Sequence, residues 1–181
     1  MRIVGVDDGA FRLSKRAKQR TLLVAVLFDN LALLSLRVGR IRVDGRDANA
    51  VIRSLLERMS CDTVMLSGIS FGGFNVVDIA QLSRILRRPV IAVTGERPHN
   101  EAVRTALREH FEDWRDRWRM VRSAGRVHSI TLHGESPLYF EVQGATHLFA
   151  KRAIASTAVI SRLPEPIRVA RILARGLSGL S

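Results

Sequence analysis

Close to its N-terminus the sequence reads Arg2-Ile3-Val4-Gly5-Val6-Asp7-Asp8-Gly9, a short strand that is apolar on both faces and ends in two adjacent carboxylates. Strands of this kind lie in the middle of parallel sheets, where helices cover both faces. Such sheets bind ligands at the carboxyl ends of their strands. The pair Asp7 and Asp8 is therefore expected to hold a cation, to orient a reacting group or to cap the next turn.

The segments that follow predict a mixed sheet. Two apolar strands, at about 21–28 and 31–43, are joined by a hairpin turn at Asp29-Asn30. Helices and buried strands then alternate, which is typical of right-handed parallel crossovers. These elements are expected at about 47–59 (helix), 63–66 (strand), 76–86 (helix) and 89–93 (strand). The later elements expected are strands at 127–132 and 138–142 and helices at 146–159 and after Pro164-Glu165-Pro166.

The bulk composition favours one α/β domain spanning residues 1–181. At 181 residues and 46% hydrophobic, the chain is able to bury a core of its own. No apolar run approaches the length of about 20 residues that spans a bilayer, and no signal-peptide pattern is present. The one cysteine, Cys61, has no disulfide partner and excludes a cysteine-based zinc cluster. We therefore expect a cytoplasmic protein that has no membrane partner.

The charge balance predicts a polyanionic partner. The chain carries 29 basic and 17 acidic residues, for a net charge of +12, and its only lysines are Lys15, Lys18 and Lys151. Arginine binds phosphate as a bidentate fork, so contact with nucleic acid is expected. The stretch after the first strand is predicted to be an exposed loop that follows a nucleic-acid backbone through Arg12, Lys15, Arg16, Lys18 and Arg20.

A glycine-rich segment, Ser67 to Asp78, follows a buried strand and opens a helix. Free backbone N–H groups at such a position attract anions. The residues expected to approach a phosphate are Ser67, Gly68, Gly72, Gly73 and Asn75. A purely structural alternative is that Asn75 caps the helix and pairs with Asp78 three residues later. For Asp44 and Asp47, before the preceding helix, capping is the favoured interpretation.

Arginines recur on two predicted helices. The first is one long amphipathic helix over about 100–122, with Val103, Leu107, Trp114, Trp118 and Val121 on its apolar face. Its arginines lie in a neighbouring sector, and acidic residues at i±3 or i±4 spacing are expected to neutralise them. In the final helix, Arg168, Arg171 and Arg175 share a face opposite the apolar side.

Three motifs of the chain resemble a known family. They are Val4-Gly5-Val6-Asp7-Asp8-Gly9, the segment Gly68 to Asp78, and Pro164-Glu165-Pro166-Ile167-Arg168-Val169-Ala170-Arg171. They look like the archaeal domain-of-unknown-function family ninety-nine, which is similar to endonuclease V. Over essentially the whole chain, the resemblance implies an RNase H-like fold and cleavage of a strand near deaminated purine, with Mg²⁺ held by carboxylates. Asp7 matches the aspartate that ends the first strand in that family.

The chain departs from the endonuclease V pattern at several positions. Ser67-Gly68 stands where the resemblance implies Asp-Gly, Thr94-Gly95 lacks the expected lysine, and Gly144-Ala145 lacks the expected histidine. The tyrosine-bearing wedge that probes the lesion also has no counterpart near residues 12–20. A hydroxyl is a poor substitute for a carboxylate as a ligand of a hard cation.

These departures leave three interpretations open. In the first, the protein is a nuclease dependent on Mg²⁺ or Mn²⁺, with a rebuilt metal site of Asp7, Asp8, Asp78 and Asp47, of which the first three are catalytic. In the second, it binds nucleic acid without catalysis because the metal site has been lost. The third is an enzyme that acts on small phosphorylated molecules through its glycine-rich segment.

Overall fold

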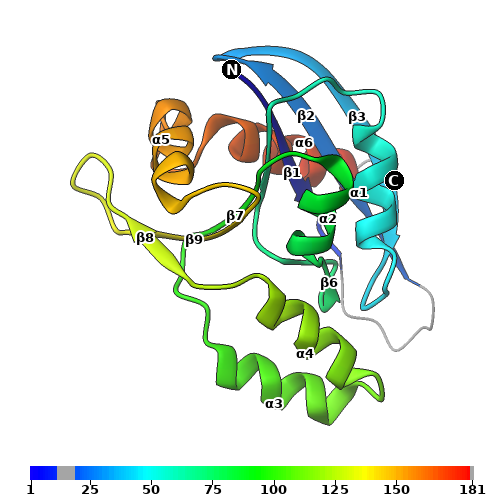
Figure 1. Ribbon diagram of the computed structural model, residues 1–181. Helices are drawn as coiled ribbons and strands as arrows, with labels where there is room; N and C mark the ends of the chain where they lie inside the picture. The colour runs from blue at the N-terminus through cyan, green and yellow to red at the C-terminus, as the bar shows by residue number, and fades with distance from the viewer. Residues whose placement is uncertain (12–18, 180–181) are drawn as a thin grey trace.

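The structure is a computed structural model that describes residues 1–11 and 19–179. Within these residues, seven strands form one sheet in the order β3-β2-β1-β4-β7-β9-β8 (Figure 1). They are β1 (Arg2–Asp8), β2 (Arg20–Asp29), β3 (Ala32–Arg42), β4 (Thr63–Leu66), β7 (Val90–Thr94), β8 (His128–Ile130) and β9 (Leu138–Gln143). A separate short hairpin pairs β5 (Ser70–Phe71) with β6 (Asn75–Val76).

The predicted mixed sheet is confirmed. Strands β1, β4 and β7 run parallel in its centre, and the antiparallel strands β2 and β9 flank them. The hairpin turn between β2 and β3 is one residue later than predicted: Asp29 pairs with Ala32, so the turn falls on Asn30 and Leu31. Asn30 adopts a left-handed φ of 52°, a conformation that asparagine tolerates better than most residues, and this fixes the turn.

Helices cover both faces of the sheet, as the apolar character of β1 predicts (Figure 1). One face packs against α1 (Ala48–Leu56) and α2 (Ile79–Leu86), and the other packs against α5 (His147–Thr157) and α6 (Glu165–Ser178). In β1, Val4 and Val6 belong to the first core and Ile3 belongs to the second. No helix in the described part of the chain is long and apolar enough to cross a bilayer.

Helix α6 crosses β1 at Gly5, where the close approach excludes any side chain. A Cβ atom at Gly5 would lie 2.1 Å from the backbone carbonyl of Pro166, near the start of the helix. Side chains alternate along a strand, so Gly5 and Asp7 face the same side of the sheet. The contact therefore lets α6 lie on β1, so that Arg171, further along the helix, reaches Asp7.

The prediction of one helix over residues 100–122 is wrong. Two helices are present, α3 (Asn100–His110) and α4 (Trp114–Ser123), and Phe111 is extended between them. Phe111 packs edge-on against Phe74 of the glycine-rich segment, with ring centroids 5.5 Å apart. Tertiary packing thus stabilises a break that helical periodicity does not reveal. The predicted apolar face is still used, because Val103, Leu107, Trp114, Trp118 and Val121 pack in one cluster.

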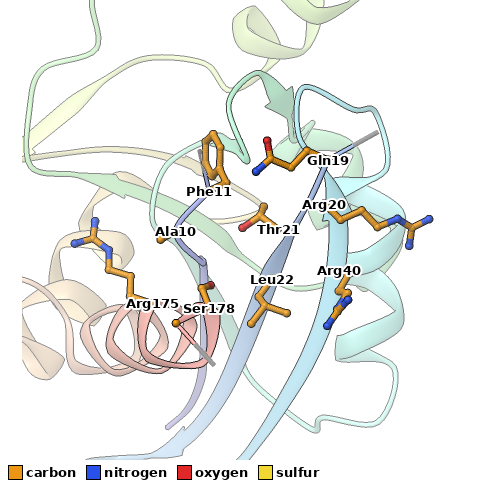
Figure 2. Close-up of a pocket in the computed structure, with 10 residues that line it drawn as sticks. Ala10, Phe11, Gln19, Arg20, Thr21, Leu22, Arg40, Arg175 and Ser178 are labelled. Atoms are coloured by element: carbon orange, nitrogen blue, oxygen red, sulfur yellow. The ribbon is translucent and has the colours of Figure 1, made fainter. Parts of the chain in front are cut away.

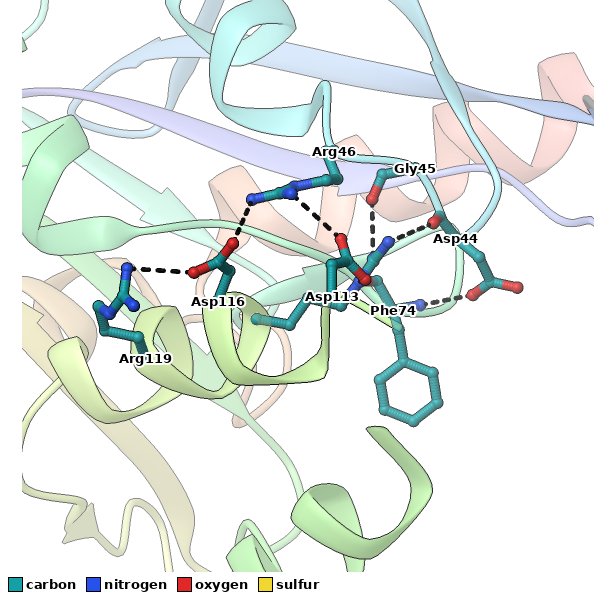
Figure 3. A network of polar contacts seen from close by, with 8 residues as sticks. Asp44, Gly45, Arg46, Phe74, Asp113, Asp116 and Arg119 are labelled. Atoms are coloured by element: carbon teal, nitrogen blue, oxygen red, sulfur yellow. Dashed lines mark hydrogen bonds and ion pairs between the residues drawn. The ribbon is translucent and has the colours of Figure 1, made fainter. Parts of the chain in front are cut away.

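Arg117 connects this helical pair to the segment between β3 and α1. Figure 3 shows its partners Asp44, Gly45, Phe74 and Asp113. Its buried guanidinium donates to the carbonyl oxygens of Asp44 (3.0 Å), Gly45 (2.9 Å) and Phe74 (2.6 Å). It also pairs with the Asp113 carboxylate at 2.8 Å, and the carboxylate of Asp44 accepts from the N–H of Phe74 at 2.8 Å. These bonds satisfy buried carbonyl groups, and those at Phe74 hold the glycine-rich segment against α4 and the β3–α1 connection.

Candidate active site

Asp7 lies at the end of β1 with both carboxylate oxygens engaged. Its Oδ1 accepts hydrogen bonds from the Ser67 hydroxyl at 2.5 Å and from the N–H of Asp8 at 2.9 Å. Its Oδ2 accepts from Nε of Arg171 at 2.7 Å. Asp7 is only 4% exposed, so the carboxylate depends on these donors rather than on water.

Asp8 is held by the glycine-rich segment. Its carboxylate accepts a hydrogen bond from the N–H of Gly72 at 2.5 Å. The pKa of Asp8 is raised to about 6, chiefly by burial and also by the charge of Asp7, although the bond from Gly72 acts in the opposite sense. Together with the Ser67–Asp7 bond, this contact confirms that the acidic strand end and the segment after Leu66 converge.

The contact between Arg171 and Asp7 was not predicted from the sequence. The pattern of the last helix predicts an arginine face, but the three members of that face have different surroundings. Arg168 forms a two-pronged ion pair with Glu165 at 2.7 Å, whereas Arg175 lines a separate cavity. Gly5 is the sequence feature that indicates such a contact. A glycine inside a strand often marks the close approach of another backbone, and here it lies two residues before Asp7 on the same face.

A cavity of about 630 Å³ opens beside these residues, and we call it the active-site cavity. Ser67, Gly68 and Arg171 line one part of the cavity. Thr94 and Gly95 line another part, at the end of β7. Its apolar lining comes from Ile69, Val103 and Val121. A mixed lining and a volume of several hundred Å³ are typical of sites that bind a small molecule or a nucleotide-sized group.

Glu141 on β9 is a second residue that sequence analysis missed. It lines the active-site cavity, it is 5% exposed, and no other described residue donates a hydrogen bond to its carboxylate. Burial raises its pKa to about 7. A buried carboxylate whose one partner among the described residues is its own backbone N–H is costly in stability, and groups with a perturbed pKa cluster at functional sites. In the sequence, Glu141 is one polar residue in an alternating strand, so only the structure reveals its burial.

The glycines predicted to approach a phosphate have more specific surroundings in the structure. Gly68, Gly72 and Gly73 adopt positive φ angles of 118°, 51° and 85°, which favour glycine. Gly68 lines the active-site cavity, whereas the N–H of Gly72 is used by Asp8. A Cβ atom at Gly73 would contact the carboxylate of Asp44. The segment therefore serves first to position carboxylates.

The predicted helix cap at Asn75 is wrong. Helix α2 begins at Ile79, and Asp78 is its N-cap, with Oδ1 accepting from the N–H of Gln81 at 2.9 Å. Asn75 is fully buried, and its Oδ1 accepts from the N–H of Ala48 at 3.0 Å while its Nδ2 donates to Asp47 at 2.7 Å. Asn75 thus accepts a hydrogen bond from a backbone N–H in the first turn of α1 that has no partner within the helix. The sequence around Asn75 gives no sign of this role.

The four carboxylates predicted to bind metal are not brought together. Asp78 Oδ1 also accepts from the Ser123 hydroxyl at 3.0 Å, and Asp47 accepts from the N–H of Arg42 at 3.1 Å. Asp47 precedes α1 as predicted, but its side chain does not cap the helix. Across residues 1–11 and 19–179, no group of three or more His, Cys, Asp or Glu side chains is arranged to hold a metal ion. Asp7 and Asp8 remain as the acidic pair of the site.

A second cavity, of about 490 Å³, lies next to the residues that follow β1 (Figure 2). Arg20 of β2, Arg40 of β3 and Arg175 of α6 all line it. Arg20 is the predicted nucleic-acid-binding residue that the structure describes. The other predicted contacts, Arg12, Lys15, Arg16 and Lys18, lie outside the described residues. The cavity adds a cationic surface to the region just beyond Asp8.

Comparison with known proteins identifies the family. Residues 1–178 match the model of a family described as Endonuclease dU. The chain belongs to the Endonuclease dU family. A UPF0215 protein of Methanothermobacter thermautotrophicus is 36% identical over 183 residues, which cover 98% of this chain and 88% of the relative.

Solved structures share the fold of this Endonuclease dU family member. A protein of unknown function from Archaeoglobus fulgidus matches with a TM-score of 0.84 and 26% identity, covering 97% of each chain. Endonuclease V of Ciona intestinalis, solved with inosine-containing DNA, matches with a TM-score of 0.62 and 14% identity over 99% of this chain and 87% of that one. The RNase H-like fold and the likeness to endonuclease V are confirmed, but the label of family ninety-nine is not.

In this Endonuclease dU family member, the acidic pair fits one hydrated Mg²⁺ or Mn²⁺ better than two ions. Mg²⁺ keeps several waters and needs only one or two carboxylates besides a substrate phosphate. Asp7 and Asp8 supply two carboxylates, and the charge of Asp7 helps to raise the pKa of Asp8, a repulsion that a cation would relieve. A second ion would lack the carboxylate that the resemblance to endonuclease V implies at the position of Ser67. An ion at Asp7 would compete with Arg171.

Proposed function

We propose that this protein is an endonuclease that hydrolyses a phosphodiester bond in nucleic-acid strands containing deoxyuridine. The observation that carries the proposal is the buried carboxylate of Asp7, which is bonded to Ser67 and Arg171 at the edge of the active-site cavity. This cluster lies at the carboxyl end of a central strand, where sheets of this class bind ligands. The name of the family, Endonuclease dU, supports both the reaction and the base.

Mg²⁺ or Mn²⁺ would be held by Asp7 and Asp8. When bound, such an ion supplies positive charge that stabilises the transition state of phosphodiester hydrolysis. Arg171 contributes in its own right: Nε is bonded to Asp7, whereas its terminal N–H groups have no partner among the described residues. Because Arg171 lines the cavity, these groups would bind the phosphate as a fork. Asp7 thus also orients Arg171.

Glu141 would exchange a proton with the strand bound in the active-site cavity. A general base or acid works best when its pKa is close to the working pH, and burial raises the pKa of Glu141 to about 7. Glu141 and Ser67 line the same cavity, but β4 and β7 lie between β1 and β9, so Glu141 is about 14 Å from β1 and would meet the bound strand at the opposite wall of the cavity from Asp7.

The partner would be a DNA strand. Endonuclease V of Ciona intestinalis was solved with inosine-containing DNA, and its fold is that of this chain. The net charge of +12 favours association with a polyanion. The cavity lined by Arg20, Arg40 and Arg175 provides cations next to the acidic pair.

A second candidate function is nucleic-acid binding without cleavage. It is favoured by the ion pair itself, because Arg171 already neutralises Asp7, and by the incomplete set of carboxylates in the described residues. In that case the site would be a phosphate-binding site only.

Cleavage assays separate the two functions. Labelled strands with one deoxyuridine, one inosine or neither are incubated with purified protein across a range of Mg²⁺ and Mn²⁺ concentrations. We expect metal-dependent cleavage of the deoxyuridine strand, and loss of cleavage in Asp7→Asn. Retention of strands without cleavage, unchanged in that variant, would establish the binding function. Equal cleavage of all three strands would remove the base specificity, and a failure to bind any strand at low salt would reject both functions.

A further inference from the structure

A third cavity, of about 520 Å³, lies where β8, β9 and the start of α5 meet, and we call it the cationic cavity. Its polar lining consists of Arg97, Arg126, His128, Ser129, Tyr139, His147 and Lys151. None of the described lining residues is acidic. Within the described residues, Arg97, Arg126 and Lys151 also have no ion-pair partner, unlike Arg46, Arg117 and Arg168. Uncompensated cations around one cavity repel each other and attract an anion.

The histidines of the cationic cavity report its positive field. The rings of His128 and His147 stack with centroids 4.9 Å apart and planes 9° from parallel. The pKa of His128 is lowered, first by burial and then by the charges of His147, Arg126 and Lys151. His147 is also the first residue of α5, so the positive end of this helix lies at the same place. The positive charges that surround His128 and the N-terminal end of α5 favour a bound anion at this place.

The cationic cavity continues directly from the active-site cavity. Arg97 lines both of them. Thr94 at the end of β7 pairs with Tyr139 of β9, which in turn pairs with Ser129 of β8. The sheet order places β4 and β7 between β1, which carries Asp7, and β9, so the cationic cavity lies three to four strand spacings, about 14–19 Å, from β1. A nucleic-acid strand bound at Asp7 would therefore span several nucleotides to reach the cationic cavity.

We propose that the cationic cavity binds a backbone phosphate of the nucleic-acid strand, several nucleotides from the bond that is cut, with Arg126 and Lys151 as the principal contacts. The proposal rests on the proposed function, which brings the strand to Asp7. The cationic cavity would be a second phosphate-binding site, separated from Asp7 by Arg97, which lines both cavities. It would fix the direction in which the strand leaves the active-site cavity.

Binding measured without cleavage tests the proposal. The affinity for a fluorescent strand with one deoxyuridine is measured in chelator, at several salt concentrations, for the wild type and for Arg126→Ala/Lys151→Ala. We expect the variant to bind about tenfold more weakly or worse, and the slope of log affinity against log salt to fall by about 2. The control, Arg58→Ala/Arg152→Ala, removes the same charge from exposed sites outside the cavity and is expected to bind almost as the wild type does. Equal weakening in both variants would overturn the proposal.

Position-specific neutralisation identifies the phosphate. Single methylphosphonate linkages are placed at each of several positions on both sides of the deoxyuridine. We expect one position at which the neutral linkage weakens binding of the wild type but not of Arg126→Ala/Lys151→Ala, because the two changes remove the same contact. The absence of any such position, or competition only by inorganic phosphate and by strands with a terminal phosphate, would overturn the proposal.

These outcomes are distinguishable from failure of the proposed function. A position-specific effect without cleavage would reject the nuclease and retain the phosphate site, whereas cleavage without such a position would do the reverse. If the double alanine variant does not fold, as judged by its thermal melt, Arg126→Gln/Lys151→Gln removes the charges while it keeps more of the packing.

Discussion

Nε of Arg171 donates to Oδ2 of Asp7 at 2.7 Å, so a guanidinium neutralises the carboxylate that ends the central strand. Only 6% of the Asp7 side chain is exposed, against 39% for Arg171, so the cost of breaking the pair falls mainly on Asp7. The ion pair therefore stabilises the fold, and Arg171 competes with any cation that binds Asp7.

Arg171→Gln is expected to lower the free energy of unfolding by about 2 kcal/mol in chelator, because a buried carboxylate loses its counter-charge. Mn²⁺ is expected to raise the melting temperature of this variant more than that of the wild type, because the ion no longer competes with Arg171. The control is Arg168→Gln, which breaks the neighbouring pair with Glu165. Thermal melts with and without Mn²⁺ check the prediction, and equal shifts in all three proteins would contradict it.

Glu141→Gln is expected to stabilise the protein at alkaline pH. The folded-state pKa of about 7 lies above the ordinary value of 4.5, so the folded protein binds more protons than the unfolded chain between these values. Stability therefore falls as the pH rises through that window, and the variant escapes the loss. We expect a gain of up to about 3 kcal/mol at pH 8 and almost none at pH 4, measured by urea unfolding.

The same substitution tests the proton-transfer role. If Glu141 exchanges a proton during cleavage, Glu141→Gln loses most of the activity together with the limb of the pH profile that titrates near pH 7. A variant that is more stable at pH 8 and still cleaves with the wild-type pH profile would assign Glu141 no part in the reaction.

Ser67→Asp is expected to lower the stability of the metal-free protein and to raise its affinity for Mn²⁺. The Ser67 hydroxyl lies 2.5 Å from Oδ1 of Asp7, so a carboxylate there would repel Asp7 in the absence of metal. With Mn²⁺, the added carboxylate would complete a set of three hard ligands. We expect a lower melting temperature in chelator and tighter Mn²⁺ binding by titration calorimetry. Ser54→Asp places the same charge at an exposed position of α1, outside the active-site cavity, and should do neither.

Gly5→Ala is expected to cost 2 kcal/mol or more, on the order of the larger overpacking penalties, because its methyl group would lie 2.1 Å from the carbonyl of Pro166. Gly176→Ala in the same helix has open space around it and should stabilise by about 0.5–1 kcal/mol. Urea unfolding of the two variants checks both signs. Equal stability of Gly5→Ala and the wild type would show that α6 does not press on β1.

Much of the fold follows from local patterns in the sequence. The apolar strand ending at Asp7 and the alternation of helices and strands up to Val93 predict the central parallel strands, and the structure confirms them. The break at Phe111 is not predictable in this way, because its cause is a ring contact with Phe74, 37 positions earlier in the chain. Local periodicity carries no information about such a contact.

The candidate site is predictable only in part for the same reason. Asp7, Asp8 and Ser67 follow from the rule that ligands bind at the ends of parallel strands. Asn75 and Asp78 are both good caps, and the choice between them depends on the first turn of α1, which takes the side chain of Asn75. The burial of Glu141 depends on elements that pack on β9 and is not visible in the strand itself.

Asp7 and Arg171 are separated by 164 positions in the chain. A polypeptide still emerging from the ribosome would therefore possess its acidic pair long before the guanidinium that balances it. Docking of α6 across Gly5 completes the charge balance, so the acidic centre is assembled only when two distant parts of the chain have met.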